Sequence, residues 1–523
     1  MSRGAADVGA GLAAVRPARQ IRPRERIHVV GAAGAGASAA ALHATWAGAV
    51  VDGCDPGGPS PYTAALEAAR IDLAWAHDPA HVHPPAGPLD RLAVTKALTA
   101  VAPDHAELMA ARNAGLPVEA WQQIVADAAF GRTLAAVAGT HGKSTSAGWL
   151  THVLVAAGRD PAAFVGALLP GSLTGGTRAT ARRGGGAMFV VEADEYAGNF
   201  DPFVPDVAIV TSVDWDHPDV FDDLEAVVSA MATWLRRAGQ RGTHVPTLVA
   251  NVADAGVERL VDRLVDWPGR LIATALVDVA PQRVAGYGRG IAERFTTAGG
   301  QTRTVIGRPA RLDPNGTTLE LRGLGDPEAP RDVRLSTAGR HNAANAVGVA
   351  GAALALGLDA DDIVGGLASF GGVGRRLERK GEAGGVVVYD DYGHHPTAIR
   401  ETIRALRQLE PDRRLWAVLE PLTYHRTAAL RDDLGAALAT ADAAVVADIW
   451  PGRDPDHTIA SPADVAQAAA KVNPGLTAAT PGSVEATAAW LAGEVRPGDA
   501  VLVMGGGRSY RIAELLLEAL GGT

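Results

Sequence analysis

The stretch VAGTHGKSTSAG, residues 137–148, lies between an apolar run and a segment whose composition predicts a helix. Gly139 and Gly142 let backbone N–H groups turn toward one point, at the positively polarised N-terminus of that helix. Lys143 adds a mobile positive charge at the same point. A strand, a glycine turn and a helix in this order predict a phosphate-binding loop within an α/β fold.

The loop has the short pattern G-x-x-G-K-[ST] over residues 139–144, because Val137 stands where the longer P-loop pattern has its first glycine. Ser144 or Thr145 can place a hydroxyl on Mg²⁺. Four of the 48 basic residues are lysine, so a lysine kept at position 143 is less easily explained as background surface charge. A glycine turn with a solvated lysine is the alternative, and a bound nucleoside triphosphate is the better prediction.

Acidic residues follow two apolar runs beyond the loop, VVEADEY at 190–196 and VAIVTSVDWDH at 207–217. The candidate ligands in these runs are Glu192, Asp194, Glu195, Asp214, Asp216 and His217. Neighbouring strands of a parallel sheet end at one rim, so these groups are expected beside the phosphate loop, where Mg²⁺ must sit. Acids after strands also serve as helix caps, but two such strand ends together with the phosphate loop in one domain favour the metal site.

A second glycine loop, VVGAAGAGAS at 29–38, also follows an apolar strand. Its glycines are spaced G-x-x-G-x-G, which differs from the G-x-G-x-x-G of dinucleotide-binding folds, although Asp55 follows at the expected distance. Redox chemistry would also leave the Lys143 loop without a role. We therefore predict a loop for another diphosphate, such as a nucleotide sugar, with a purely structural turn as the alternative.

Strand, loop and helix recur in this order along the chain, which predicts parallel sheets with helices on both faces. A third such unit begins at Val386 and continues into a helix opened by Pro396. Residues 290–340 have short alternating runs that predict antiparallel strands. The fold class is therefore α/β with three domains: a Rossmann-like N-terminal domain, a central P-loop ATPase-type parallel sheet with a small β appendage, and a Rossmann-like C-terminal domain.

Composition limits the possible partners of the 523-residue chain. A net charge of −10 argues against a nucleic-acid partner or an anionic membrane surface, and no apolar run is long enough to span a bilayer. The single cysteine, Cys54, fits a reducing, cytoplasmic compartment. Six arginines in the first 26 residues favour a disordered leader over 1–24, with a targeting peptide as the alternative.

Nine motifs in order resemble those of the Mur ligases of peptidoglycan synthesis, over about residues 25–515. They are HVVGAAGAGAS, VAGTHGKST, VEADEY, VAIVTSVDWDH, GRHNAANAVGVAGAA, GVGRRLE, VYDDYGHHPTAI, PLTYHRT and ADIWPGRD. The resemblance implies a UDP-sugar-binding domain at 25–128, an ATP-binding domain at 129–371 and a ligase domain at 372–523. It implies an ATP-dependent amide ligase that uses Mg²⁺ and joins an amino acid, with L-alanine expected, to UDP-N-acetylmuramate through an acyl phosphate.

Matching positions carry over the family's site residues. The implied ATP contacts are Gly139, Thr140, His141, Gly142, Lys143, Ser144, Thr145, Asn342, Asn345, Arg376 and Asp391. The implied magnesium ligands are Ser144, Thr145, Glu192 and His217. The implied catalytic set is Lys143, Glu192, His217, Arg376, Asp391 and His394, with His395 as an alternative to His394. The implied UDP-sugar contacts are Gly31, Gly34, Gly36, Ala37, Ser38, Asp55 and His77.

Between residues 129 and 371 the chain has no lysine except Lys143, which excludes the carbamylated lysine of sibling ligases and points to the branch acting on UDP-N-acetylmuramate itself. The sequence departs from the family pattern at 420–425, at 505–512 and at Cys54, where a serine is usual. These departures leave open which amino acid is added. A ligase for a preformed tripeptide and a nucleotide-binding homologue without catalysis are the competing hypotheses, and the sequence leaves the oligomeric state open.

Overall fold

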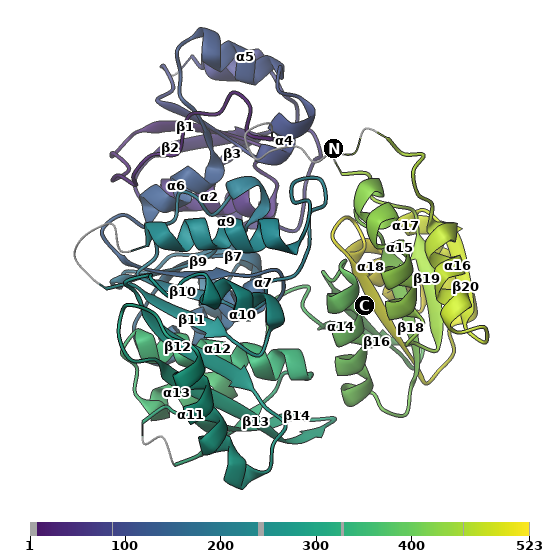
Figure 1. The fold of residues 1–523 in the computed structure, drawn as a ribbon. Coiled ribbons are helices and arrows are strands. Elements are labelled where there is room, and N and C mark those ends of the chain that lie inside the picture. Colours follow the sequence, from purple (N-terminus) through teal and green to yellow (C-terminus); the bar gives the residue numbers. More distant parts are fainter. Residues whose placement is uncertain are drawn as a thin grey trace.

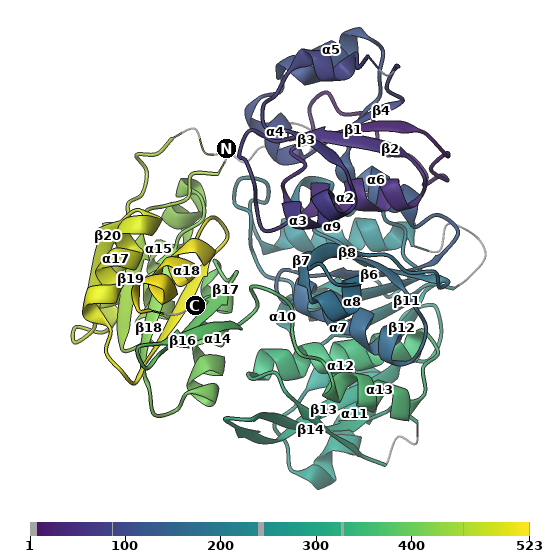
Figure 2. The same cartoon turned by 180° about the vertical axis from the view of Figure 1, so that it is seen from behind.

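The computed structural model describes residues 8–85, 87–238, 245–325, 329–452, 454 and 456–521, which form three lobes (Figure 1). The N-terminal and central lobes are stacked in one column, and the C-terminal lobe stands beside it, as the view from behind confirms (Figure 2). Within the described residues, no helix has both the length and the apolar character that a membrane span requires. The α/β class and the three-part organisation predicted from the sequence are confirmed.

The N-terminal lobe contains five parallel strands in the order β3-β2-β1-β4-β5. The strands are β1 Arg26–Val30, β2 Val50–Cys54, β3 Asp72–Ala74, β4 Arg91–Val94 and β5 Val118–Ala120. The helices are α2 Ala35–Trp46, α3 Thr63–Ala68, η1 Pro79–Val82, α4 Lys96–Val101, α5 Ala106–Asn113 and α6 Trp121–Ala128. This strand order is that of a Rossmann-type sheet, whose ligands bind beyond the carboxyl ends of the strands.

The central lobe is a ten-stranded sheet in the order β15-β14-β13-β12-β11-β10-β6-β9-β7-β8. The strands are β6 Thr133–Ala138, β7 Ala162–Leu169, β8 Ala179–Arg182, β9 Met188–Glu192, β10 Val207–Val210, β11 Thr247–Asn251, β12 Arg270–Leu276, β13 Arg303–Asp313, β14 Gly316–Arg322 and β15 Arg331–Leu335. The helices are α7 Lys143–Ala156, α8 Gly171–Thr174, η2 Tyr196–Gly198, α9 Leu224–Arg237, α10 Ala255–Asp262, η3 Pro281–Arg283, α11 Val284–Arg294, α12 Arg340–Ala355 and α13 Ala360–Ala368. The predicted β appendage is the antiparallel run β13-β14-β15, which continues the edge of the parallel sheet.

Strand β6 shows how the sequence builds two layers. Its apolar residues alternate, with Ala136 in the core on one face and Ala135 and Val137 in the core on the other. Helices α7, α12 and α13 cover the second face, and α9, α10 and α11 cover the first. A strand buried on both faces explains why this segment reads as a continuous apolar run.

The C-terminal lobe has six strands in the order β16-β17-β21-β18-β19-β20, with only β16 antiparallel. The strands are β16 Glu378–Ala383, β17 Val386–Asp391, β18 Arg414–Glu420, β19 Ala443–Ala447, β20 Thr477–Gly482 and β21 Asp499–Gly505. The helices are α14 Pro396–Leu409, α15 Tyr424–Leu438, α16 Pro462–Val472, α17 Val484–Glu494 and α18 Tyr510–Ala519. Pro396 opens α14 as the sequence predicts.

The cores of the lobes are connected to different extents. Buried residues of α2 and α6 belong to the same apolar cluster as Phe164 and Phe189 of the central sheet. The C-terminal lobe has its own clusters, and Trp215 packs against both its core and the central core. The column of the first two lobes therefore shares an apolar core, whereas the third lobe joins it mainly through polar contacts, described below.

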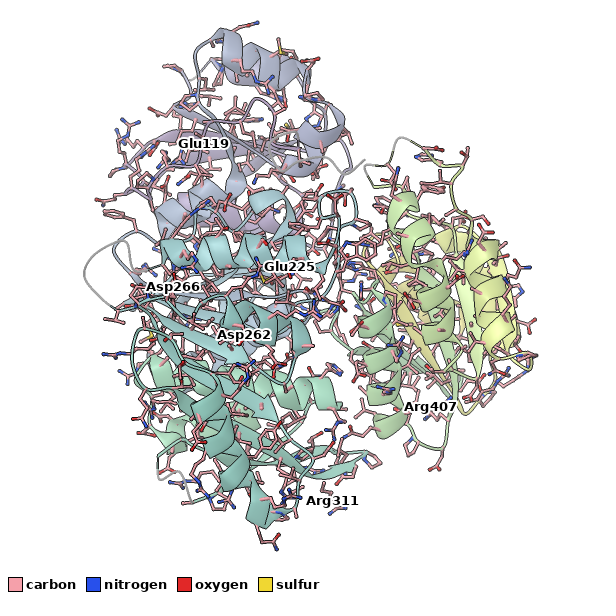
Figure 3. The ribbon with its side chains drawn as sticks, viewed as in Figure 1. Glu119, Glu225, Asp262, Asp266, Arg311 and Arg407 are labelled. Atoms are coloured by element: carbon pink, nitrogen blue, oxygen red, sulfur yellow. The ribbon has the colours of Figure 1, made fainter. Side chains whose placement is uncertain are left out.

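Residues 8–24 differ from the expected disordered leader. Arg16 donates to Glu119 at 2.8 Å and to Asp127 at 2.7 Å, and Val8 is buried against Tyr196. Glu119, labelled in Figure 3, lies in the N-terminal lobe. The arginine-rich composition suggested a solvated segment, but buried carboxylates of the folded lobe bind Arg16. Residues 1–7 lie outside the described part of the chain.

Candidate nucleotide and ligase site

One cleft of about 1070 Å³ is lined by residues of all three lobes. The N-terminal lobe contributes the loop after β1, the central lobe contributes the Lys143 loop and the ends of β9 and β10, and the C-terminal lobe contributes the loop after β17. The predicted rim of strand ends is thus the floor of this cleft. The candidate residues from distant parts of the sequence meet here.

The backbone of the phosphate loop requires glycine at two positions. Gly139 has a φ of +124°, and a Cβ there would lie 2.4 Å from the Thr211 hydroxyl. Gly142 has a φ of +81°, and a Cβ there would lie 2.5 Å from the Asn345 side-chain oxygen. The N–H of Thr140 donates to the Ser212 carbonyl at 2.9 Å, which fixes the loop to the end of β10. Gly139 shapes the turn beneath the cleft, and residues 140–145 line it.

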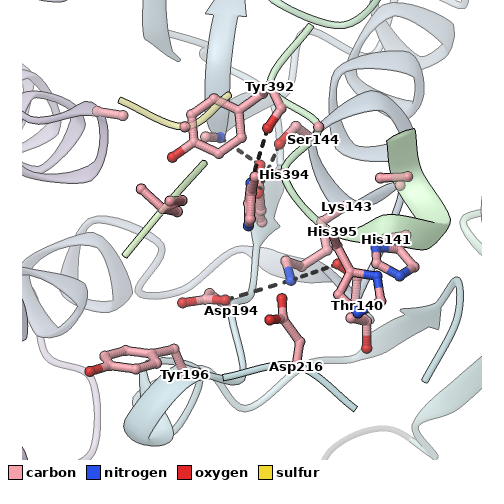
Figure 4. Close-up of a pocket in the computed structure, with 18 of the residues that line it drawn as sticks. Thr140, His141, Lys143, Ser144, Asp194, Tyr196, Asp216, Tyr392, His394 and His395 are labelled. Atoms are coloured by element: carbon pink, nitrogen blue, oxygen red, sulfur yellow. Dashed lines mark hydrogen bonds and ion pairs between the residues drawn. The ribbon is translucent and has the colours of Figure 1, made fainter. Parts of the chain in front are cut away.

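Lys143 lies at the start of α7 and faces the acids that follow β9 (Figure 4). Its Nζ donates to Glu195 Oε2 at 2.9 Å and lies 3.5 Å from Asp194. Burial alone would lower the pKa of Lys143, but Glu195 and Asp194 raise it above its ordinary value. Burial raises the pKa of Glu195 to about 7 in spite of the lysine. The charge on Lys143 is therefore held by carboxylates in a position where a phosphate could compete for it.

Ser144 forms hydrogen bonds with two other predicted site residues, Glu192 and Arg376. Its Oγ donates to Glu192 Oε1 at 2.9 Å, and Arg376 Nη2 donates to the same Oγ at 2.7 Å. The other Glu192 oxygen accepts from the Gly166 N–H at 2.6 Å. The Arg376 guanidinium lies over the Tyr392 ring, and its Nε is buried without a hydrogen-bond partner among the described residues. An arginine of the C-terminal lobe thus reaches the phosphate loop of the central lobe.

His217 lies across the cleft floor in a left-handed conformation, with φ of +58°. Arg426 of α15 donates to His217 Nδ1 at 3.0 Å and to Asp216 Oδ1 at 2.6 Å. Burial lowers the pKa of His217 to about 4, so its ring is neutral at pH 7. Burial would raise the pKa of Asp216, but Arg426 holds it well below its ordinary value. This is a second bridge between the central and C-terminal lobes.

Asp391 and His394 occupy the loop that follows β17. The Asp391 oxygens accept from the backbone N–H groups of Leu377 and Gly393, each at 2.7 Å. Asp391 lines the cleft, and the two backbone N–H groups fix the orientation of its carboxylate there. His394 Nδ1 donates to the Tyr392 carbonyl at 3.0 Å, as Figure 4 shows, and this leaves Nε2 with a free lone pair.

His395 differs from His394 in its role. Its Nδ1 accepts from the Thr397 N–H at 3.3 Å and caps α14. Its ring lies 4.7 Å from that of His141, between centroids. The Thr397 hydroxyl donates to Asp214 at 3.1 Å, which is a third contact between the lobes. Here the structure favours an orienting role for His395.

Asn342 and Asn345 project from the first turns of α12 toward the loop. Asn345 lies against Gly142, and Asn342 Nδ2 donates to the Ala338 carbonyl at 2.7 Å. Both line the cleft, as does Thr145. The predicted adenine-side residues are therefore brought to the phosphate loop.

The N-terminal lobe contributes most of the predicted UDP-sugar residues to the cleft: Gly31, Gly34, Gly36, Ala37, Asp55 and His77. Asp55 accepts from the Ala33 N–H at 3.1 Å, which ties it to the glycine loop. Ser38 is placed differently, because its hydroxyl is buried against Thr180 of β8. As the fourth residue of α2 it faces the central lobe, so its prediction as a UDP-sugar contact does not fit the structure.

Arg426 was not among the predicted site residues. It lies within the PLTYHRT motif, and its type in that motif was the signal that could have identified it. Its partners Asp216 and His217 are 209 residues or more away in the chain, so no local pattern indicates the pairing. Glu195 and Asp194 had been recognised as strand-end acids, but sequence alone did not show that they hold Lys143.

Two groups on the cleft floor suit a divalent cation that prefers oxygen. Asp194, Glu195 and His217 each offer a ligand atom within 4.8 Å of the others. Glu192 and Ser144 form the neighbouring pair, and Glu195 Oε1 is buried without a hydrogen-bond partner in the part of the chain that the structure describes. Carboxylate and hydroxyl oxygens are the ligands that Mg²⁺ prefers. The residues present therefore fit the predicted metal.

Comparison with known proteins gives matches over nearly the whole chain. Three sequence profiles match: "Mur ligase family, catalytic domain" at 26–132, "Mur ligase middle domain" at 137–353 and "Mur ligase, glutamate ligase domain" at 375–507. The UDP-N-acetylmuramate–L-alanine ligase of Kineococcus radiotolerans is 37% identical over 95% of this chain and 96% of its own. That of Mycobacterium sp. (strain JLS) is 35% identical over 95% of each chain.

Solved structures share the fold at lower identity. The UDP-N-acetylmuramate-alanine ligase of Thermotoga maritima superposes with a TM-score of 0.71 at 22% identity, covering 94% of this chain and 98% of its own. A murein peptide ligase of Psychrobacter arcticus gives 0.68 at 23% identity, covering 95% and 99%. Three lobes around one phosphate loop, with these relatives, define an ATP-dependent amide ligase. The chain belongs to the Mur ligase family.

Proposed function

We propose that this protein joins L-alanine to UDP-N-acetylmuramate in the cytoplasm, with conversion of ATP to ADP and phosphate, for peptidoglycan biosynthesis. The names of its relatives support this substrate pair. The observation that carries the catalytic part is the contact of Arg376, from the C-terminal lobe, with Ser144 in the phosphate loop. We assign the UDP-sugar to residues 25–128, ATP to 129–371 and the closing ligase domain to 372–523.

The reaction must first activate a carboxylate, because amide formation from a carboxylate and an amine is unfavourable in water. A carboxylate oxygen of the sugar nucleotide attacks the γ-phosphorus of ATP, forming an acyl phosphate and releasing ADP. The amine then attacks the acyl carbon, and the tetrahedral intermediate expels inorganic phosphate, which carries away the proton lost by the amine nitrogen. Lys143 and Arg376 stabilise the negative charge on the transferred phosphoryl group, and the closed cleft excludes water from the acyl phosphate.

Ser144, Thr145, Glu192 and His217 would hold Mg²⁺, with Asp194 and Glu195 close by. The cation would neutralise charge on the ATP phosphates. Because Arg426 donates to Nδ1, the neutral His217 ring carries its proton on Nε2, so coordination by His217 would require the ring to give up the Arg426 contact or that proton. Arg426 of the C-terminal lobe therefore competes with a cation for the lone pair of His217.

His394 is assigned to orient the incoming amine. Burial lowers its pKa well below the ordinary value, so the ring is neutral but weakly basic. Nδ1 is fixed by the Tyr392 carbonyl, and Nε2 can accept a hydrogen bond from the amine. His394 therefore acts by position more than by taking up the proton.

The experiment follows ADP and phosphate release with UDP-N-acetylmuramate and a panel of amines. The panel contains L-alanine, L-serine, glycine and a tripeptide. We expect the highest kcat/KM with L-alanine. A preference for the tripeptide would replace the proposed amine by a peptide, and no turnover with any amine, together with intact ATP binding, would leave a nucleotide-binding protein without ligase activity.

A further inference from the structure

A cluster of metal-ligating side chains lies in the N-terminal lobe, apart from the phosphate loop. His28, Cys54, His81 and Glu107 each offer one ligand atom within 4.8 Å of the others. Cys54, His28 and Glu107 are buried, and His81 is partly exposed. They come from β1, the end of β2, η1 and α5, so four separate segments bring nitrogen, sulfur and oxygen donors to one point.

The distances around Cys54 suit a tetrahedral ion. Cys54 Sγ lies 3.3 Å from His28 Nε2 and 3.4 Å from each oxygen of Glu107. Ligands at about 2.1–2.3 Å from a tetrahedral zinc ion are separated from one another by about 3.4–3.6 Å. Cys54 Sγ is thus already near the separation from His28 and Glu107 that a common ion would give. His81 Nδ1 lies 2.6 Å from Glu107 Oε1, which is a hydrogen-bond distance, so these two atoms would have to move apart by about 1 Å to share an ion.

His28 has the outer hydrogen bond that is typical of a metal-binding histidine. Its Nδ1 lies 2.6 Å from Asp52 Oδ1, so it donates its proton there and Nε2 presents a lone pair to Cys54. A carboxylate in this position fixes the ring tautomer of a metal ligand and increases its basicity. Asp52 belongs to β2, which lies directly beside β1 in the sheet. The register of the two strands places Asp52 opposite His28.

The centre of the cluster is rich in lone pairs. The Cys54 thiol has one proton but faces His28 Nε2, Glu107 and His77 Nδ1, the last at 3.2 Å. Burial and the adjacent carboxylate raise the pKa of Cys54, so the thiol keeps that proton when no cation is near. A divalent cation would replace the thiol proton and satisfy several lone pairs at once.

We propose that His28, Cys54, His81 and Glu107 form a binding site for a divalent transition metal of the zinc type. Thiolate, imidazole and carboxylate ligands select a borderline-soft ion over Mg²⁺. The ion joins η1 and α5 to the middle of β1 and the carboxyl end of β2. His77, which lines the cleft and contacts Cys54, connects this site with the N-terminal wall of the cleft.

The alternative is a metal-free hydrogen-bond network in which the thiol donates to one of its neighbours. The two cases differ in a measurable way, because Cys54 is the only cysteine of the chain. A thiolate-to-metal signal can therefore come from no other residue. The acids beside Lys143 can also bind a cation, but they contain no sulfur.

The experiment titrates untagged, full-length, metal-free protein with Co²⁺ and records its absorption spectrum. We expect a thiolate-to-cobalt charge-transfer band and the visible bands of a tetrahedral ion, saturating at one ion per chain and displaced by Zn²⁺. Cys54→Ser should lose the charge-transfer band, and His81→Ala should weaken binding. Asp52→Asn should weaken it by about 10–100-fold. His83→Ala, which alters an exposed histidine two residues from His81, is the matched control and should bind as the wild type does.

A wild-type protein that shows no charge-transfer band with excess Co²⁺ would overturn the proposal, even if cobalt binds elsewhere. Circular dichroism of each variant shows whether a lost band reflects a lost ligand or a lost fold. The wild-type spectrum decides the question if Cys54→Ser fails to fold. The readout is independent of ligase activity, so it does not depend on the proposed reaction.

Discussion

Replacement of Arg426 by methionine tests whether the C-terminal lobe is held in place by a buried charge pair. The Arg426 and Asp216 side chains are 6% and 8% exposed, and they are joined by a hydrogen bond of 2.6 Å. Methionine keeps much of the length and apolar contact of the arginine stem but leaves Asp216 and His217 without their donor. Asp216 then keeps the His217 backbone N–H as a donor but stays buried without its charge partner whenever the cleft is closed.

The magnitude follows from this burial. Removal of one partner from a buried ion pair costs about 3–5 kcal/mol. At about 1.4 kcal/mol for each factor of ten, the closed arrangement loses a factor of about one hundred to a few thousand. We expect kcat/KM for ADP release to fall by about this factor. The melting temperature should change less, because opening the lobes lets water reach Asp216.

The assay compares Arg426→Met with Arg431→Met, which removes an exposed arginine of the same helix whose ion-pair partner is the adjacent Asp432. The control should retain wild-type turnover. If Arg426→Met also turns over within about threefold of the wild type, the reasoning from the buried bridge is refuted. Loss of Arg426 should also raise the pKa of Asp216. The turnover of Arg426→Met should therefore begin to fall at a higher pH on the acid side than that of the wild type.

Three further perturbations test other parts of the structure. Lys143→Ala should abolish ADP release with little change in melting temperature; turnover near the wild-type rate would show that the loop does not hold phosphate. Gly142→Ala should weaken ATP binding measured by calorimetry, because the added Cβ meets Asn345, whereas Gly131→Ala has a similar positive φ with open space around it and should cost only stability, about 1–2 kcal/mol. Burial lowers the pKa of His43 to about 4 from 6.5, so the unfolded chain binds its proton first and stability falls as pH drops from 6.5 toward 4, by about 3 kcal/mol. His43→Gln should reduce the change of unfolding free energy with pH, measured from urea unfolding curves at several pH values. An unchanged pH dependence would contradict a role for His43 in it.

The sequence predicted the parts of the site that local patterns encode. Strand, glycine turn and helix predicted the Lys143 loop, and the polar residues at strand ends placed Glu192 and His217 in the same cleft, because parallel strands bring such ends together. The three sheets followed from the same alternation. The domain boundaries given from the sequence and the roles of the individual site residues stay predictions.

The remaining features depend on contacts that no local pattern records. Ser38 has the composition of a phosphate-loop residue, but its place on α2 points it at Thr180 of the next lobe. Asp391 lines the cleft as expected, and the sequence does not show that its oxygens also accept the backbone N–H groups of Leu377 and Gly393. Arg16 reads as a solvated charge, yet it binds carboxylates more than 100 residues away. In each case the tertiary partner decides the role.

The apolar cluster shared by the first two lobes has a consequence for protein engineering. Phe164 and Phe189 would lose their cover if the chain were cut near residue 130, whereas the sheet after residue 372 has complete cores of its own. A chimera that exchanges residues 372–523 with those of a relative should therefore fold as two intact parts. Because His394 of this lobe is proposed to orient the amine, such a swap tests whether the amine can be changed while the nucleotide half is inherited unchanged.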